Sequence, residues 1–124
     1  TPKEEVCVSR HNDLGAEGEA LAASYLETQG YCIRARNFRS GKGEIDIIAS
    51  DGNTLVFVEV KTRSTARFGL PREAVTPFKQ SMLRKTAMAY LVQLPKEIPC
   101  RFDVVEIQIH ANGTYQLNQL KNAF

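Results

Sequence analysis

Two carboxylates and a lysine occur close together in the middle of the chain. Asp46 belongs to the segment GEIDIIA (43–49), and Glu59 and Lys61 belong to the segment TLVFVEVKT (54–62). Carboxylate oxygens are ligands that Mg²⁺ prefers, and a nearby lysine can orient or deprotonate a water molecule. A hard cation held by Asp46 and Glu59 could therefore supply the attacking water for hydrolysis of a phosphate ester.

The second segment is apolar on both faces until the charged residues appear. Alternation along a strand puts Phe57, Glu59 and Lys61 on one face. The other face carries Val56, Val58 and Val60. Glu59 and Lys61 would then emerge near the end of a central strand, where charges need partners or a cleft. A simple Glu59–Lys61 salt bridge, with Asp46 exposed, is the alternative to a metal site.

The two segments are predicted strands, and the rest of the chain predicts helices and hairpins around them. Asp51-Gly52 and Asn112-Gly113 are typical of tight turns between antiparallel strands. A helix with Thr76 as N-cap and Pro77 at its first position allows one parallel crossover. The expected elements are a helix that begins at Asp13 and ends at Gly30, strands 31–38, 44–49 and 54–62, a helix 77–94, and strands 101–109 and 114–120.

This order, α-β-β-β-α-β-β, predicts an α/β fold with one mixed β-sheet flanked by helices. Residues 1–12 are expected to form a flexible leader, and residues 13–124 a single domain with a hydrophobic core. The segment 63–75 has no clear pattern, and we expect a mobile loop with a short helical turn near its end. The expected buried side of the second helix consists of Phe78, Met82, Leu83, Ala89 and Tyr90.

The composition excludes several classes of protein. An apolar content of 43% and a charged content of 24% are ordinary for a soluble globular protein. No stretch approaches the roughly 18 apolar residues of a membrane span. The 3 cysteines lack metal-ligand spacing, which argues against a structural zinc site and favours reduced thiols in a cytoplasm.

Charge is distributed unevenly along the chain, although the net charge is only +2. Residues 31–85 hold 11 basic and 5 acidic side chains, whereas residues 1–30 hold 2 basic and 6 acidic ones. A basic surface around a small acidic site suits a phosphate backbone that approaches a bound metal ion. A solvated surface of mixed charge is the alternative explanation.

The segments GEID (43–46) and FVEVKTR (57–63) together make the chain similar to a known superfamily. It resembles the restriction-endonuclease-like (PD-(D/E)xK) nucleases, whose active site has an aspartate, a variable gap and then Glu-x-Lys. Among them it is most similar to the YraN-like bacterial proteins, and the 13 positions from Asp46 to Glu59 resemble the spacing in archaeal Holliday-junction resolvases. Further matching residues are Gly15-x-x-Gly18-Glu19, Ala22, Tyr25, Leu26, Arg36-Asn37-Phe38-Arg39, Phe68-Gly69, Arg101-x-Asp103-Val104-Val105 and Asn122-Ala123-Phe124.

The resemblance implies a role for five residues. Asp46 and Glu59 would be ligands of Mg²⁺ or Mn²⁺, and the carbonyl of Val60 would be a further ligand. Glu19 would be the carboxylate that the first helix contributes to the catalytic and metal site. Lys61 would be the catalytic lysine.

Two glutamates leave alternatives open. Glu17 and Glu19 lie on opposite margins of the apolar stripe of the first helix, and mainly the resemblance favours Glu19. Glu44 shares a strand face with Asp46, so it could support the metal ligands or substitute for one of them. An ion pair of Glu44 with Lys42 or Arg63 is the preferred interpretation.

Basic residues in the middle of the chain are candidates for binding nucleic-acid phosphates. A solvated loop is the alternative for the arginines near residues 63–75. Asp103 is expected to form a structural pair with Arg101 or another arginine. Gln80 is a candidate for supporting the site from the start of the second helix. The candidate phosphate-binding residues are Arg36, Arg39, Lys42, Arg63, Arg67, Arg72 and Lys79.

The predicted function is a cytoplasmic endonuclease that needs Mg²⁺ or Mn²⁺ and hydrolyses phosphodiester bonds of nucleic acid. DNA is the preferred substrate, and the resolvase analogy suggests branched or repair intermediates. Resolvases work as dimers, which leaves a homodimer open, and no membrane partner is expected. A non-catalytic nucleic-acid-binding module and a protein-interaction factor with the same fold are the alternatives, because one fold hosts many functions.

Overall fold

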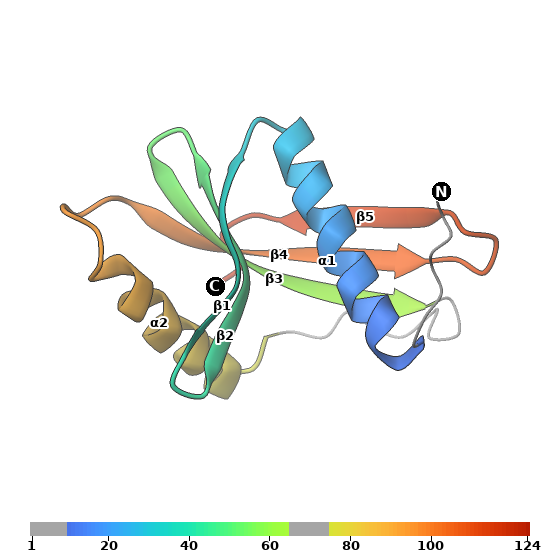
Figure 1. Cartoon of the computed structure of the whole chain (residues 1–124), viewed down its shortest axis with the longest axis horizontal. Coiled ribbons are helices and arrows are strands. Elements are labelled where there is room, and N and C mark those ends of the chain that lie inside the picture. The colour runs from blue at the N-terminus through green and yellow to red at the C-terminus, as the bar shows by residue number, and fades with distance from the viewer. Residues whose placement is uncertain (1–9, 65–74) are drawn as a thin grey trace.

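The computed structural model describes residues 10–64 and 75–124, with side chains from residue 14 onward. The described elements confirm the predicted order of helices and strands (Figure 1). They are α1 (Arg10–Thr28), β1 (Cys32–Ser40), β2 (Gly43–Asp51), β3 (Thr54–Ser64), α2 (Pro77–Leu91), β4 (Cys100–Ile109) and β5 (Tyr115–Leu120).

The strands form one mixed sheet in the order β1-β2-β3-β4-β5. Strands β3 and β4 are parallel, and the other neighbouring pairs are antiparallel. The predicted crossover is therefore confirmed, with α2 connecting the two parallel strands. Gly52 and Gly113 have φ values of 61° and 92°, which explains why both hairpin turns need glycine there.

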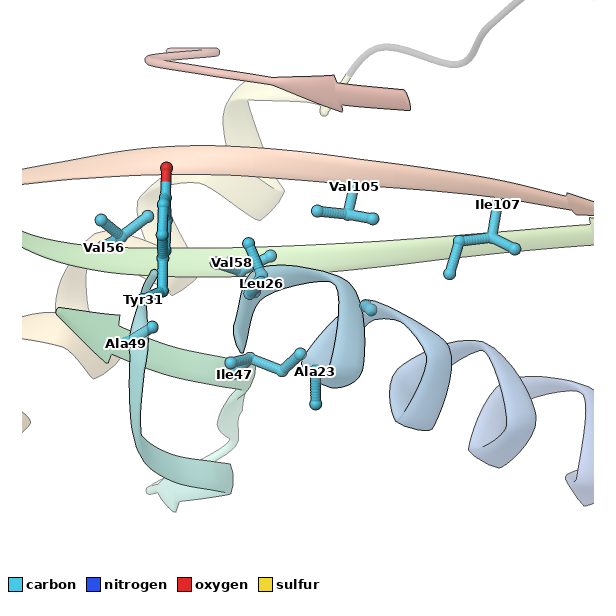
Figure 2. Packing of buried hydrophobic residues seen from close by; sticks show 10 residues of the cluster. Ala23, Leu26, Tyr31, Ile47, Ala49, Val56, Val58, Val105 and Ile107 are labelled. Carbon is cyan, nitrogen blue, oxygen red and sulfur yellow. The ribbon is translucent and has the colours of Figure 1, made fainter. Parts of the chain in front are cut away.

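Helix α1 covers one face of the sheet and packs mainly against β3. Leu26 from the helix lies over Val58 of β3 and Ile47 of β2, with Val105 of β4 beside them (Figure 2). Tyr31 follows the helix directly and closes the same cluster. These buried apolar side chains fix the position of α1 on the sheet, because their burial is the main force holding the helix there.

Helix α2 lies on the opposite face and packs mainly against β2. Leu83 and Ala87 contact the buried Ile48 and Phe57 from the sheet, and Tyr90 packs edge-on against Phe57 at 6.3 Å between ring centroids. Phe57 thus faces α2, whereas its neighbours Val56 and Val58 belong to the cluster under α1. The predicted division of β3 into two faces is confirmed.

The buried side of α2 differs from the prediction, most clearly at Phe78. Phe78 is 75% exposed, so its predicted burial is wrong. The buried stripe of the helix runs through Leu83, Thr86 and Ala87, and Phe78 lies five positions before Leu83, about 140° away on the helical wheel. Met82 and Ala89 are only half-buried.

Several boundaries also differ from those predicted. Helix α1 begins at Arg10 and includes the last three residues of the predicted leader, while α2 ends at Leu91 rather than near residue 94. Strand β3 continues to Ser64, so Arg63 belongs to a strand and not to a loop. Most of the predicted loop and its helical turn lie outside the described residues. In the described part, neither helix is long and apolar enough to cross a membrane.

A buried polar network fixes one end of β4. Asp103 is fully buried, and Arg101 Nε donates to its Oδ1 at 3.0 Å, as the sequence predicts. Gln119 Nε2 and the N–H of Asn122 also donate to this carboxylate, at 2.9 Å each. Because these partners all come from the sheet or its C-terminal extension, we assign Asp103 a structural role.

Candidate functional site

Asp46 lies at the point where β2 separates from β3. The last residue pair between these strands is Ile47↔Val58, but β3 continues to Ser64 alongside β4. Beyond Val58, no described strand covers the β2 side of β3. The N–H of Val60 on this open edge donates to Asp46 Oδ2 at 2.8 Å, so the carboxylate replaces the missing strand partner.

The same place marks a change of faces along β2. Ile45 packs under α2, whereas Ile47 packs under α1, although simple alternation would put both on one face. The regular alternation of side chains between the two faces of the sheet is therefore interrupted between Ile45 and Ile47. This interruption allows the Asp46 side chain to point to the open edge of β3, where it accepts the N–H of Val60. The sequence pattern does not reveal it.

The charges of three other carboxylates act on Asp46. Burial raises the pKa of Asp46 from 3.8 to about 7, the N–H of Val60 opposes this rise, and the charges of Glu59, Glu19 and Glu44 add to it. The carboxylates come from α1, β2 and β3. Glu19 and Glu59, which the sequence suggested as one site with Asp46, thus lie within electrostatic range of it.

Glu59 and Lys61 do not form the salt bridge that was the alternative to a metal site. Glu59 is nearly buried, and its Oε2 lies 3.3 Å from Nζ of Lys79, at the start of α2. Lys61 is half-buried, and no carboxylate of the described residues pairs with it. The site therefore has one lysine engaged by a carboxylate and one whose ammonium is available.

Glu19 is joined to Glu44 by Asn37, a residue that the sequence analysis did not single out as functional. Asn37 Nδ2 donates to Glu19 Oε1 at 3.0 Å and to Glu44 Oε2 at 3.1 Å. Asn37 has a φ of 53°, a left-handed conformation that asparagine tolerates better than most residues. An asparagine inside a predicted strand was the available signal. Glu17, the alternative to Glu19 in the sequence analysis, is exposed.

Glu44 has a different ion partner from those expected. Arg39 Nε lies 3.4 Å from Glu44 Oε2, across the β1–β2 pair in which Arg39 and Glu44 are directly opposed. The structure thus gives Arg39 as the ion partner of Glu44, whereas the sequence analysis expected Lys42 or Arg63. Cross-strand register decides the partner here, and register was not evident from the sequence.

Two glycines allow both helices to approach the site closely. A Cβ on Gly18 of α1 would collide with the side chain of Thr62, next to Lys61 on β3. A Cβ on Gly43 of β2 would collide with the Thr86 hydroxyl of α2. The first contact brings Glu19, the next residue of α1, towards β3. The second holds α2 against the start of β2, which carries Asp46.

A cavity of about 490 Å³ lies along the open edge of β3. It reaches from the middle of the strand to its end and extends towards the first described side chain of α1. A strand residue directs its N–H and C=O to the same side, so the carbonyl of Val60 faces this edge together with its N–H. The described residues that line the cavity are Leu14, Glu59, Val60, Lys61, Thr62, Arg63 and Ser64.

The available donors suit a hard cation, because they are carboxylate and carbonyl oxygens. Within residues 10–64 and 75–124, however, no three acidic, histidine or cysteine side chains already converge as a metal-holding group. Each candidate carboxylate has another partner: Val60 N–H for Asp46, Lys79 for Glu59 and Asn37 for Glu19. The donor set fits Mg²⁺ or Mn²⁺ in type, and binding requires some of these contacts to be exchanged.

The remaining predicted residues lie in several places. Arg36, Arg39 and Lys42 are exposed on the β1–β2 hairpin, and Arg63 is half-buried beside the cavity. Gln80 Nε2 donates to the carbonyl of Val75 at 2.9 Å, so its predicted support of the carboxylates is not observed. The predicted phosphate-binding residues Arg67 and Arg72 lie outside the described residues.

Comparison with known proteins identifies related bacterial chains. Residues 18–107 match the family described as Uncharacterised protein family UPF0102. A UPF0102 protein of Geobacter sulfurreducens is 51% identical over 118 residues, which cover 94% of this chain and 92% of that protein. A UPF0102 protein of Symbiobacterium thermophilum is 51% identical over 112 residues, covering 90% and 95% of the two chains. One of Clostridium botulinum is 44% identical over 117 residues, covering 92% and 95%.

Proposed function

The chain belongs to the UPF0102 family, and for this member we propose a metal-dependent endonuclease that hydrolyses phosphodiester bonds of nucleic acid. The proposed cofactor is Mg²⁺ or Mn²⁺, and the proposed substrate is DNA, with branched or repair intermediates as the first to test. The proposal assigns the chain to the restriction-endonuclease-like superfamily, with similarity to Holliday-junction resolvases.

One observation carries the proposal: the partly buried carboxylate of Asp46 lies at an open strand edge, within the electrostatic influence of Glu59, Glu19 and Glu44. Burial is the main cause of the raised pKa of Asp46, and the charges of Glu59, Glu19 and Glu44 add to it, so the ionised carboxylate is unfavourable in the metal-free protein. Clustered, partly buried acids with shifted pKa values are typical of functional sites.

In the proposed mechanism, Asp46, Glu59 and Glu19 would hold the cation, with the carbonyl of Val60 as a further ligand. When bound, Mg²⁺ would supply charge stabilisation at the phosphoryl group and lower the pKa of a water molecule. Lys61 would orient the attacking water through its ammonium or, as the neutral amine, accept its proton. Lys61 suits this task because no described carboxylate holds its ammonium, and it lies on the cavity wall two residues from Glu59.

Exposed basic side chains near the site support a polyanionic substrate. Arg36, Arg39 and Lys42 on the β1–β2 hairpin are placed to contact phosphates on one side, and Arg63 lies on the cavity wall. Such contacts would make binding weaken as the salt concentration rises. The proposed location is the cytoplasm, since the cysteines that the structure describes are free and exposed. A homodimer is part of the proposal by analogy with resolvases, and light scattering would test it.

The test is cleavage of end-labelled single-stranded, duplex, flapped and four-way-junction DNA with Mg²⁺ or Mn²⁺. The proposal predicts products that carry a 5′-phosphate and that disappear with EDTA and in the Lys61→Ala variant. Salt-sensitive binding without cleavage of any of these substrates would contradict the proposal and favour a non-catalytic binding module. Cleavage that persists in Lys61→Ala would place the chemistry elsewhere or in a contaminant.

A further inference from the structure

We propose that the ammonium of Lys79 is a built-in counter-ion of Glu59, which an incoming divalent cation displaces and which then binds a phosphate of the nucleic acid. Metal binding and substrate binding would thereby be coupled through one side chain. This inference deepens the proposed function and rests on it, because it assumes a cation site at Asp46 and Glu59.

The exposure of the two partners indicates which of them moves. The Glu59 side chain is 11% exposed, whereas the Lys79 side chain is 49% exposed, and they approach to 3.3 Å. A nearly buried carboxylate needs a permanent partner, but an exposed lysine can rotate its long aliphatic chain and direct its charge into water. Lys79 can therefore leave Glu59 at little cost once another cation replaces it.

The position of Lys79 on its helix makes the released ammonium seek an anion. Lys79 belongs to the first turn of α2, which Thr76 caps and which contains no acidic residue. A positive side chain is unfavourable there, because the N-terminal end of a helix already carries partial positive charge. Glu59 offsets this at present. Without Glu59 as its partner, the Lys79 ammonium would lie at the positive end of α2, on the side of the sheet that Lys61 also faces. A phosphate bound there would offset the repulsion between this ammonium and the helix end.

The other two carboxylates proposed as ligands, Asp46 and Glu19, also have protein partners in the metal-free site. The N–H of Val60 donates to Asp46, and the amide of Asn37 donates to Glu19. Protein donors thus occupy these three carboxylates in the metal-free site, and of the donors Val60, Asn37 and Lys79 only Lys79 carries a formal charge. Exchange of Lys79 for a cation is therefore the step with the largest electrostatic consequence.

Mn²⁺ binding without nucleic acid tests the first half of the inference, measured as the loss of free Mn²⁺ signal in electron paramagnetic resonance. Lys79→Met removes the competing charge and should bind Mn²⁺ roughly two- to five-fold more tightly than the wild type. Lys79→Arg keeps the charge and should bind no more tightly than the wild type. Lys85→Met, an exposed lysine farther along α2, is the matched control and should not change the affinity.

Equal or weaker Mn²⁺ binding by Lys79→Met would overturn the inference. The same titration separates this failure from failure of the proposed function. If the wild type shows no saturable Mn²⁺ binding that Asp46→Asn removes, the cation site itself is refuted. If that site is present and Lys79→Met leaves its affinity unchanged, only the exchange is refuted.

DNA binding tests the second half, with labelled single-stranded and four-way-junction DNA in a Lys61→Ala background that prevents cleavage. Adding Mn²⁺ should tighten binding, and Lys79→Met should remove much of that gain. Lys85→Met should retain the gain while weakening binding slightly at every Mn²⁺ concentration. A Lys79→Met variant that gains as much affinity from Mn²⁺ as its parent would contradict release of Lys79 to phosphate.

Discussion

Replacing Asp46 by asparagine should stabilise the metal-free protein while it removes the proposed cation site. The asparagine has almost the same shape and keeps an oxygen that accepts the N–H of Val60, which donates to Asp46 Oδ2 at 2.8 Å. What changes is the charge. At neutral pH the folded protein must otherwise hold a carboxylate that burial and its acidic neighbours Glu59, Glu19 and Glu44 disfavour.

The size and sign of the effect follow from the pKa of Asp46, which rises from 3.8 to about 7 on folding. The folded state then binds the proton more tightly than the unfolded state, so between these pH values stability falls as pH rises. The full difference corresponds to about 4 kcal/mol. Asp46 is only partly buried and solvent screens its charge, so we expect a smaller effect. The free energy of unfolding of Asp46→Asn should exceed that of the wild type by about 2 kcal/mol at pH 8.

Urea unfolding of metal-free protein at a series of pH values from 4 to 8 measures this gain. The stability of Asp46→Asn relative to the wild type should be near zero at about pH 4, grow through about pH 5–7 and level off near pH 8. Glu97→Gln, a change at an exposed carboxylate, should show no such profile. An Asp46→Asn variant no more stable than the wild type at pH 8 would refute the electrostatic reasoning.

Two further substitutions test how the fold positions the site. Gly18→Ala should lower the free energy of unfolding by about 2 kcal/mol, because its Cβ would collide with Thr62. Urea unfolding should show a smaller loss when the same change is made in a Thr62→Ala background. An equal loss in both backgrounds would mean that the contact with Thr62 is not the cause. Arg101→Met should lower the free energy of unfolding by about 3 kcal/mol, because it leaves the fully buried carboxylate of Asp103 without its cation. Unchanged midpoints of thermal and urea unfolding would contradict the structural role of Asp103 and its partners.

Local patterns predicted the parts of this structure that depend on a few consecutive residues. The alternation around Phe57 gave the two faces of β3, and Asp-Gly and Asn-Gly gave the two hairpin turns. The hairpin joining β2 to β3 was enough to bring Asp46 near Glu59. The choice of Glu19 over Glu17 needed the family resemblance in addition, since both lie at the margins of the helical stripe.

The features that escaped prediction depend on contacts between distant residues. The partner of Glu59 is Lys79, 20 positions away, and no sequence pattern connects them. The change of faces at Asp46 breaks strand alternation, and it arises because β2 leaves β3 at that point. Asn37 joins α1 to β2 through side chains alone. Each of these three features positions a carboxylate of the candidate site.

The most direct test of the central claim is cleavage of a labelled four-way junction in Mg²⁺ by the Asp46→Asn variant beside the wild type. We expect the variant to be folded, more stable at pH 8 in the absence of metal, and inactive, while the wild type yields products that EDTA abolishes. Cleavage by Asp46→Asn at the wild-type rate would refute a cation site at Asp46, because its carboxylate would then not be needed.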